Sequence, residues 1–289
     1  MSTFLPLSVS GLCMGMVYAL MGMGLVLLMR SVGVMNFAQG DLMVIGAYIS
    51  FWLTNELNLP TIPMLFCCLI IFSVNAAIFM YGCYMPVRNS KWSQSAMICT
   101  LGADMIIREA LILLFGAEYK SAEPLVPGLL KMGPVVIEWQ YIAVIFLALL
   151  VIWAVFSLFD KMYAGKAMMA ASQDRYAAQL LGIPINLTIY CTYMIVMIIC
   201  GLAGWLIAPL FLVSTSLSAL QSKVFAGMII GGLGSLKGAV LGCIVIGLVE
   251  AYSTYVTTTY KDVVIFGVLL LMLMIRPQGF LGETNVEKA

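Results

Sequence analysis

The sequence predicts an all-α membrane protein, a polytopic bundle of about eight or nine transmembrane helices that includes interrupted or re-entrant ones. Of its 289 residues, 63% are hydrophobic and 9% are charged, whereas soluble domains carry about 25% charged residues. Long apolar runs such as 141–159 are close to the roughly 20 residues that cross the hydrocarbon core. A β-barrel would instead show short segments of alternating hydrophobicity, so helices are the expected way to satisfy the backbone in lipid.

The predicted spans follow the apolar runs, and polar, glycine and proline residues set their boundaries. They are 7–29, 41–53, 62–85, 95–115, 139–159, 189–213, 220–234, 238–257 and 263–275. The second span follows the polar, glycine-bearing segment 33–41, and the seventh ends in the glycine-rich segment 231–235. We interpret both as interrupted helices, which survive at membrane depth only where they are buried in protein or face a cavity. Paired interruptions of this kind often mark the pathway of a transporter.

The distribution of Lys and Arg predicts the orientation, because basic residues are enriched in cytoplasmic loops. If the loop after the fifth span is cytoplasmic, the N-terminus lies outside and the C-terminus inside. Most basic residues then fall on the inner side: Arg30, Arg88, Lys91, Lys161, Lys166, Arg175, Lys237, Arg276 and Lys288. A smaller set falls on the outer side: Lys120, Lys131, Lys223 and Lys261.

Two longer segments separate the spans. The outer segment 116–138 is interrupted by prolines and Gly128, which predicts turns with little helix. In the inner segment 160–188, the stretch Gly165–Leu181 is rich in Ala, Met, Leu and Gln, which are good helix formers. Gly182 and Pro184 then give a helix stop signal. We therefore expect one or two short helices on the inner membrane surface.

Several kinds of site are excluded by what the sequence lacks. It contains no histidine, which removes the commonest general base and the commonest neutral metal ligand. The cysteines lie within apolar runs and form no CxxC motif, so we interpret them as small buried hydrophobic residues. The phosphate-binding pattern GxxxxGK[ST] is also absent. We expect no catalytic residue, no metal site and no bound cofactor, and therefore not an enzyme. A net charge of +1 gives no case for a nucleic-acid partner.

The fourth predicted span holds three charged candidates for a polar pathway. An ionised side chain at the bilayer centre costs about 2.5–3.5 kcal/mol on insertion scales. Asp104 and Arg108 are four residues apart, so they meet on one helical face and can neutralise each other. A structural ion pair and a polar lining or gate both remain open for this pair. Glu109 points about 100° away from Arg108 around the helix.

The remaining polar candidates lie near the first interruption and in the eighth span. Asn36 and Gln39 can both donate and accept hydrogen bonds, so they could line a wet constriction. Asp41 precedes an apolar run and is either a pathway residue or a helix N-cap. Glu250 stands as an isolated acid within 238–257, and pathway and packing roles are equally open for it.

Several glycines recur at the spacing that lets membrane helices approach closely. They are Gly11 and Gly15, Gly227 and Gly231, and Gly234, Gly238 and Gly242. We interpret this series as helix packing.

Five segments, in order along nearly the whole chain, carry a resemblance to a known family. They are Gly33–Asp41 (GVMNFAQGD), Pro86–Lys91 (PVRNSK), Gly165–Ile183, Ala226–Ser235 (AGMIIGGLGS) and Tyr260–Gly279. Together they resemble the permeases of branched-chain amino-acid ABC importers.

The resemblance implies a single transmembrane permease domain over 1–289, located in a bacterial inner membrane among its lipids. It implies four partners: a second related permease, two cytoplasmic ATPase subunits that bind the ATP, and a periplasmic substrate-binding protein. Within the loop 160–188 it implies a coupling region that docks on the ATPase. The residues implied for coupling are Gly165, Lys166, Ala167, Arg175, Leu181, Gly182 and Ile183.

The function that the resemblance implies is ATP-driven alternating access for branched-chain or related hydrophobic amino acids. Two alternatives stay open. One is a secondary transporter driven by an ion gradient, with Asp104, Glu109 or Glu250 as a proton relay. The other is an ABC permease for urea, amides or other small polar organic solutes.

Overall fold

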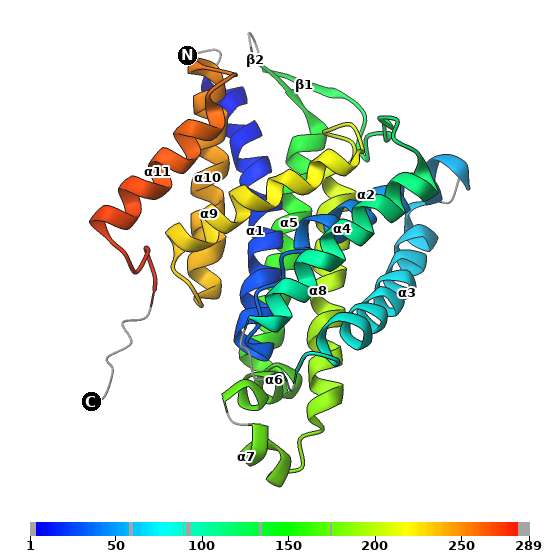
Figure 1. The fold of residues 1–289 in the computed structure, drawn as a ribbon. Coiled ribbons are helices and arrows are strands. Elements are labelled where there is room, and N and C mark those ends of the chain that lie inside the picture. Colours follow the sequence, from blue (N-terminus) through cyan, green and yellow to red (C-terminus); the bar gives the residue numbers. More distant parts are fainter. Residues whose placement is uncertain are drawn as a thin grey trace. The chain divides into compact units, whose positions relative to one another are not determined.

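The computed structural model describes residues 4–57, 60–88, 90, 94–132, 135–173 and 175–282, and Figure 1 shows its ribbon. This part of the chain is almost entirely helical, with one small antiparallel sheet. The α-helices are α1 Phe4–Val32, α2 Gln39–Phe51, α3 Thr61–Phe79, α4 Ser95–Phe115, α5 Trp139–Lys161, α6 Tyr163–Gln173, α7 Arg175–Leu180, α8 Ile185–Ile207, α9 Leu220–Gly231, α10 Leu236–Val256 and α11 Lys261–Ile275. The sheet pairs β1 Leu129–Met132 with β2 Val135–Glu138.

Every predicted span overlaps a helix, so the predicted all-α bundle is confirmed, while the number of membrane crossings stays a prediction. Five helical segments are long and apolar enough to cross a membrane: Phe4–Val32, Pro63–Tyr84, Trp139–Phe159, Ile185–Ile207 and Leu236–Val256. By contrast, α2, α9 and α11 have 13, 12 and 15 residues. At about 1.5 Å per residue they are shorter than a hydrocarbon core of about 30 Å. Short turns extend two helices: π-helical η1 Trp52–Glu56 follows α2, and η2 Met80–Tyr84 follows α3.

The predicted boundaries were wrong for one span and the outer segment holds more structure than expected. The sixth span, expected at 189–213, is α8, which begins at Ile185 and ends at Ile207. It ends there because Pro209 cannot continue the helical hydrogen bonds. The outer segment contains the β1–β2 hairpin, while the inner one holds α6 and α7, as predicted.

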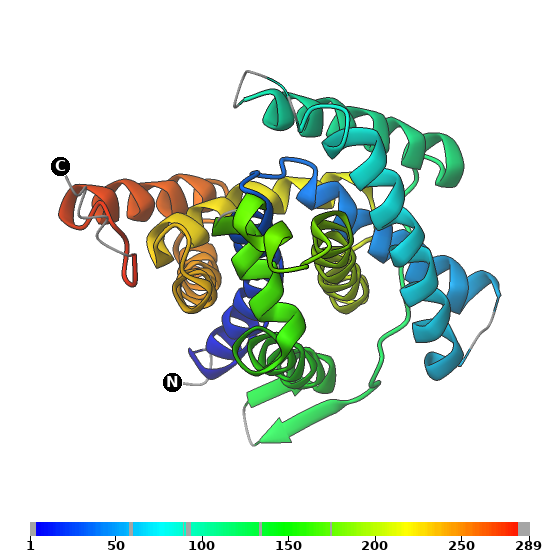
Figure 2. The ribbon, with the colours of Figure 1, turned by 90° about the horizontal axis from the view of Figure 1, so that it is seen from below.

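The chain divides into two compact units, which are described separately. Unit 1 consists of residues 1–26, 124–149 and 220–289, and unit 2 of residues 27–123 and 150–219. In unit 1, α9 lies obliquely against α10 in both ribbon views (Figures 1 and 2). A short turn joins them, in which Gly232 and Gly234 have φ values of +109° and +86°. Glycine is the residue that adopts such values without strain.

Backbone-to-backbone contact holds α9 against α10, which confirms the packing role predicted for Gly227, Gly231, Gly238 and Gly242. A Cβ atom added at Gly231 would lie 1.9 Å from the carbonyl oxygen of Gly238, and one at Gly242 would lie 2.0 Å from that of Gly227. The C-terminal segment then returns to the end of α9. The amide of Phe280 donates to the carbonyl of Ile230 at 2.8 Å. This return satisfies carbonyls that a helix end would otherwise leave unpaired.

In unit 2, α2 packs against α8 through a second glycine contact that the sequence reasoning missed. A Cβ atom at Gly204 of α8 would lie 2.0 Å from the carbonyl oxygen of Met43, and one at Gly46 would lie 2.5 Å from the Cα atom of Gly201. The close approach buries most of α2. It also fixes the position of α2 against α8, and with it the position of the polar residues in the first turn of α2.

The irregular segment before α2 is partly buried in protein, with Asn36 and Ala38 buried and Gly33 exposed. Burial in protein is what an interrupted helix at membrane depth requires. Asn36 is 1% exposed, and its Oδ1 atom accepts a hydrogen bond from the amide of Ala38 at 3.0 Å. The amide of Phe37 donates to Oγ1 of Thr100 on α4 at 3.1 Å. Side chains therefore replace the helical partners that this segment lacks.

Candidate functional site

Arg108 of α4 is the centre of a polar cluster in unit 2. Its Nη2 atom lies 3.5 Å from Oδ2 of Asp104 and donates to Oγ of Ser218 at 3.0 Å. Its Nε atom lies 3.9 Å from Oδ1 of Asp41 on α2. Ser218 belongs to the 3-10 helix η3 Thr215–Ala219, which contacts both α2 and α4. We call these four residues the Arg108 cluster; Ser218 had not been singled out from the sequence.

Asp41 is the deepest member of the Arg108 cluster, with a side chain that is 0% exposed. Of the two roles left open for Asp41, the N-cap is wrong, because Ala38 occupies the N-cap position and Asp41 lies in the first turn. There the positive end of the helix dipole favours a carboxylate. Neither carboxylate oxygen accepts a hydrogen bond from the described part of the chain.

The other predicted pathway residues on α2 and α4 have different surroundings. Gln39 is 0% exposed, and its Nε2 atom donates to Sγ of Cys200 on α8 at 2.9 Å. Gln39 therefore contributes to the contact between α2 and α8. Glu109 is exposed on a face of α4 where Met105 is 71% and Leu113 is 85% exposed. No ion pair or hydrogen bond recorded for the described residues joins Glu109 to the Arg108 cluster.

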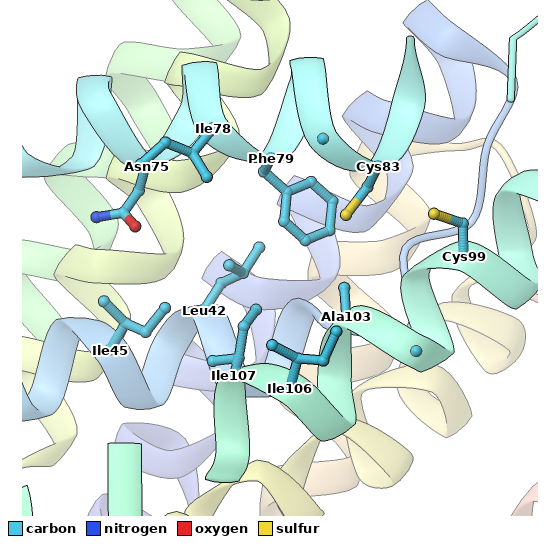
Figure 3. Close-up of a pocket in the computed structure, with 12 residues that line it drawn as sticks. Leu42, Ile45, Asn75, Ile78, Phe79, Cys83, Cys99, Ala103, Ile106 and Ile107 are labelled. Carbon is cyan, nitrogen blue, oxygen red and sulfur yellow. The ribbon is translucent and has the colours of Figure 1, made fainter. Parts of the chain in front are cut away.

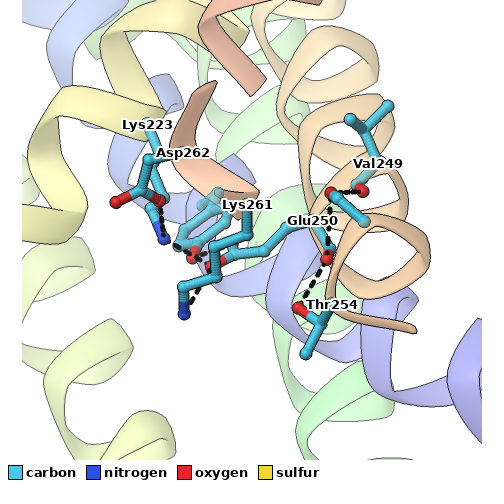
Figure 4. A network of polar contacts seen from close by, with 8 residues as sticks. Lys223, Val249, Glu250, Thr254, Lys261 and Asp262 are labelled. Carbon is cyan, nitrogen blue, oxygen red and sulfur yellow. Dashed lines mark hydrogen bonds and ion pairs between the residues drawn. The ribbon is translucent and has the colours of Figure 1, made fainter. Parts of the chain in front are cut away.

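Glu250 is not the isolated acid that the sequence indicated. Its Oε1 atom accepts a short hydrogen bond from Lys223 of α9, and its Oε2 atom accepts one from the hydroxyl of Tyr18 at 2.6 Å. Lys223 also lies 3.2 Å from Oδ1 of Asp262, and Lys261 lies 3.7 Å from Glu250. Figure 4 shows this network, all of it in unit 1. We call these five residues the Glu250 network.

Lys223 is the partner that the sequence reasoning misplaced. It had been counted with the outer loops, yet it lies in α9 and is 7% exposed. Its burial could have been predicted from its position within the predicted span 220–234, because a lysine inside a span needs a buried acid or a route to water. Glu250 was the nearest candidate of opposite charge on the next span.

The two clusters differ in charge balance. The Glu250 network holds two lysines and two carboxylates, so its formal charge is zero. The Arg108 cluster holds two carboxylates and one guanidinium. Buried charges that are matched and hydrogen-bonded are typical of a structural ion-pair network. An unmatched group at membrane depth is typical of a functional position.

Arg108 provides a first test of the ion-pair geometry. Replacing it by alanine leaves Asp41 and Asp104 facing each other without a base, whereas lysine keeps one positive charge. We expect Arg108→Ala to lower the yield of folded, monodisperse protein in detergent more than Arg108→Lys does. Size-exclusion chromatography of the two variants at equal expression measures this. Equal losses would contradict a role in simple charge pairing.

The predicted coupling residues lie on and after α6 and α7. Gly165 is buried, and a Cβ atom there would lie 2.5 Å from the Cα atom of Phe159, so α6 is held directly against the end of α5. Lys166 is exposed. Gly182 has φ +81°, which ends the helical segment and turns the chain toward α8. The side chain of Arg175 lies outside the described side chains.

Ala167 and Ile183 line one small cavity of about 190 Å³ between α6 and the start of α8. Leu181 is 80% exposed, and Leu180, Tyr163 and Tyr176 are exposed to a similar degree. The described surface of α6 and α7 therefore presents apolar side chains beside the exposed Lys166.

An apolar cavity of about 500 Å³ lies between α2, α3 with η2, and α4 (Figure 3). Its lining includes Ile78 and Phe79 from α3 and Ile106 from α4, and Asn75 is its one amide side chain. Gly82 and Gly102 add to its open space, since a Cβ atom at either would meet nothing within 4 Å. None of the described residues that line the cavity is charged, so the cavity differs in character from the Arg108 cluster.

Comparisons with known proteins agree over nearly the whole chain. A family model described as "Branched-chain amino acid transport system / permease component" matches residues 7–273. The high-affinity branched-chain amino acid transport system permease protein BraD of Pseudomonas aeruginosa is 30% identical over 99% of this chain and 98% of its own length. The corresponding permease protein LivH of Escherichia coli K12 is 31% identical over 99% and 97%. A probable LivH of Methanocaldococcus jannaschii is 24% identical over 91% and 88%.

These relatives are transport permeases rather than enzymes, and the five long apolar helices make this chain a multi-pass membrane protein. A solved structure, PsaBC from Streptococcus pneumoniae in complex with Fab, aligns with 95% of this chain and 92% of its own at a TM-score of 0.49 and 14% identity, and that likeness adds nothing to the assignment. The match over residues 7–273, together with relatives of nearly equal length, establishes that the chain belongs to the family of permease components of branched-chain amino acid transport systems.

Proposed function

We propose that this chain is a permease subunit of an ABC importer that moves branched-chain or related hydrophobic amino acids across the inner membrane. The observation that carries the proposal is the family match over residues 7–273, joined to relatives whose names specify that transport. A second related permease, two cytoplasmic ATPase subunits and a periplasmic binding protein complete the importer. ATP binds to the ATPase subunits, and this chain supplies part of the pathway.

The apolar surface of α6 and α7 supports a docking role. Leu180 is 72% exposed and Leu181 is 80% exposed, and contiguous exposed apolar side chains outside the hydrocarbon region mark protein interfaces. Gly165 holds α6 against the end of α5, so a push on α6 is transmitted to a long transmembrane helix. In this mechanism, closure of the ATPase dimer moves α6 and α7, and the attached spans switch between outward-open and inward-open states.

The proposed orientation places α6 and α7, and the C-terminus, in the cytoplasm, with the N-terminus in the periplasm. The burial of Lys223 in α9 supports it, because a lysine paired inside the protein no longer counts as a basic residue of an outer loop. The remaining outer basic residues are fewer than the inner ones. Cysteine labelling from either side of the membrane at Lys166 tests this orientation.

The docking role predicts that the double substitution Leu180→Ser, Leu181→Ser separates the permease from its ATPase. Removing two exposed leucines eliminates apolar contact area of the kind that stabilises interfaces, while the helices themselves remain. We expect co-purification of the ATPase to fall about tenfold, equivalent to about 1.4 kcal/mol of affinity. The matched control is Val126→Ser, an exposed apolar residue of the predicted outer segment, which should leave co-purification unchanged. Undiminished co-purification of the double variant would refute docking through these helices.

A further inference from the structure

The Arg108 cluster contains more negative than positive charge. Asp41 and Asp104 both lie within 4 Å of the guanidinium of Arg108. Arg108 directs the shorter of its two contacts to Asp104 and donates to Ser218. One guanidinium is therefore shared between two carboxylates, and Asp41 has the longer contact.

Asp41 is a buried acid whose hydrogen-bonding capacity is unused within the described chain. Its side chain is 0% exposed, and neither of its carboxylate oxygens accepts a hydrogen bond there. Buried polar groups are almost always hydrogen-bonded, so an exception needs a further partner. The missing partner must donate hydrogen bonds, and the charge balance favours one that is positively charged.

The cluster can be reached from outside the protein. The side chain of Arg108 is 44% exposed and that of Asp104 is 21% exposed. Charged side chains in membrane-spanning helices face the interior of a bundle or a water-filled cavity rather than lipid. By this rule the exposed side of Arg108 is expected to face water rather than lipid, with Asp41 at the buried end of the cluster.

We propose that the Arg108 cluster receives the ammonium group of an amino acid during its passage. This inference rests on the proposed function and specifies the substrate's chemistry. A primary ammonium group has three N–H donors, which suits two carboxylates that a single guanidinium leaves under-compensated. Arg108, which keeps exposed surface, faces the carboxylate of the same molecule. Urea and amides carry no positive charge, so this site selects against that alternative substrate class.

The Glu250 network does not offer an equivalent site. Glu250 already accepts hydrogen bonds from Lys223 and Tyr18, and Asp262 is paired with Lys223. A substrate ammonium would have to displace a buried lysine there. The same physical criterion, charge left over after internal pairing, therefore separates the two clusters.

The test uses the complete importer in proteoliposomes with ATP, radiolabelled leucine and the variants Asp41→Asn and Asp104→Asn. Each variant removes one negative charge and leaves the neutral amide in place, so folding should be retained. We expect leucine uptake to fall about tenfold or more, because a charge-assisted hydrogen bond contributes roughly 1.5–3 kcal/mol. ATP hydrolysis stimulated by the loaded binding protein should persist, so more ATP is consumed for each leucine moved.

Two controls make the result specific. Glu109→Gln removes a carboxylate from the same helix, on an exposed face away from the cluster, and should leave the ratio of ATP to leucine unchanged. Asp104→Glu keeps the negative charge that Asp104→Asn removes, and should retain much of the uptake. If both Asn variants transport leucine as well as the unmodified importer, a shared proton neutralises the acids and the ammonium site is refuted. If the unmodified importer takes up no leucine, the proposed function itself fails, which is a separate outcome.

Discussion

Replacing Lys223 by methionine is expected to destabilise the protein by about 3–5 kcal/mol, the range for removing one partner of a buried ion pair. Lys223 is 7% exposed and Glu250 is 9% exposed. Without the lysine, the counter-groups of Glu250 among the described residues are the hydroxyl of Tyr18 and the more distant amine of Lys261. The measurement is the unfolding temperature of purified protein in detergent, followed by tryptophan fluorescence.

Two further variants separate charge pairing from loss of packing. Lys261→Met removes a lysine of the same network that is 38% exposed and 3.7 Å from Glu250, and a pair so exposed contributes about 1 kcal/mol or less. The double variant Lys223→Met, Glu250→Gln removes both buried charges and should recover most of the lost stability, because no uncompensated carboxylate remains. A double variant as unstable as Lys223→Met alone would show that shape, rather than charge, matters at this position.

Gly204→Ala is expected to lower stability by about 1–3 kcal/mol or more, the usual cost of overpacking. The added Cβ atom would lie 2.0 Å from the carbonyl oxygen of Met43 and 2.7 Å from the amide nitrogen of Ala47. Both are backbone atoms of α2, so α2 itself must move away from α8. Because Asp41 lies on α2, uptake should fall together with the unfolding temperature.

Gly102→Ala is the matched control, since it is the same substitution inside another helix of unit 2, α4. A Cβ atom at Gly102 meets nothing within 4 Å, and alanine is favoured over glycine in a helix by about 0.5–1 kcal/mol. The unfolding temperature should therefore rise slightly or stay the same. Equal destabilisation by Gly204→Ala and Gly102→Ala would argue that helix flexibility, not the contact between α2 and α8, explains the effect.

The sequence predicted the helices well because lipid constrains them strongly. The span at 95–115 coincides with α4, and the interruptions at 33–41 and 231–235 were found because glycine and polar residues are conspicuous in apolar surroundings. Pairing between helices was harder to predict. Glu250 and Lys223 lie 27 residues apart, and Arg108 and Ser218 lie 110 apart. Spacing along one helix revealed Asp104 with Arg108, but contacts across helices depend on how the helices pack.

The same limit explains the errors in the candidate site. Asp41 was weighed as an N-cap because caps are recognised from local sequence, yet the structure begins α2 two residues earlier, at Gln39. The return of the C-terminal segment to the end of α9 leaves no periodic signal, because it consists of backbone hydrogen bonds from Phe280 and Leu281. Sequence reasoning found most of the residues with unusual chemistry and could not assign their partners on other helices.

The most direct test of the account is leucine uptake by the complete importer in proteoliposomes under two energy conditions. With ATP supplied and a protonophore present, uptake should continue at its full rate, because nucleotide binding and hydrolysis on the partner subunits move this chain. With a non-hydrolysable ATP analogue and an imposed proton gradient, uptake should stop. Uptake that persists without hydrolysis and collapses with the protonophore would instead identify a transporter driven by an ion gradient.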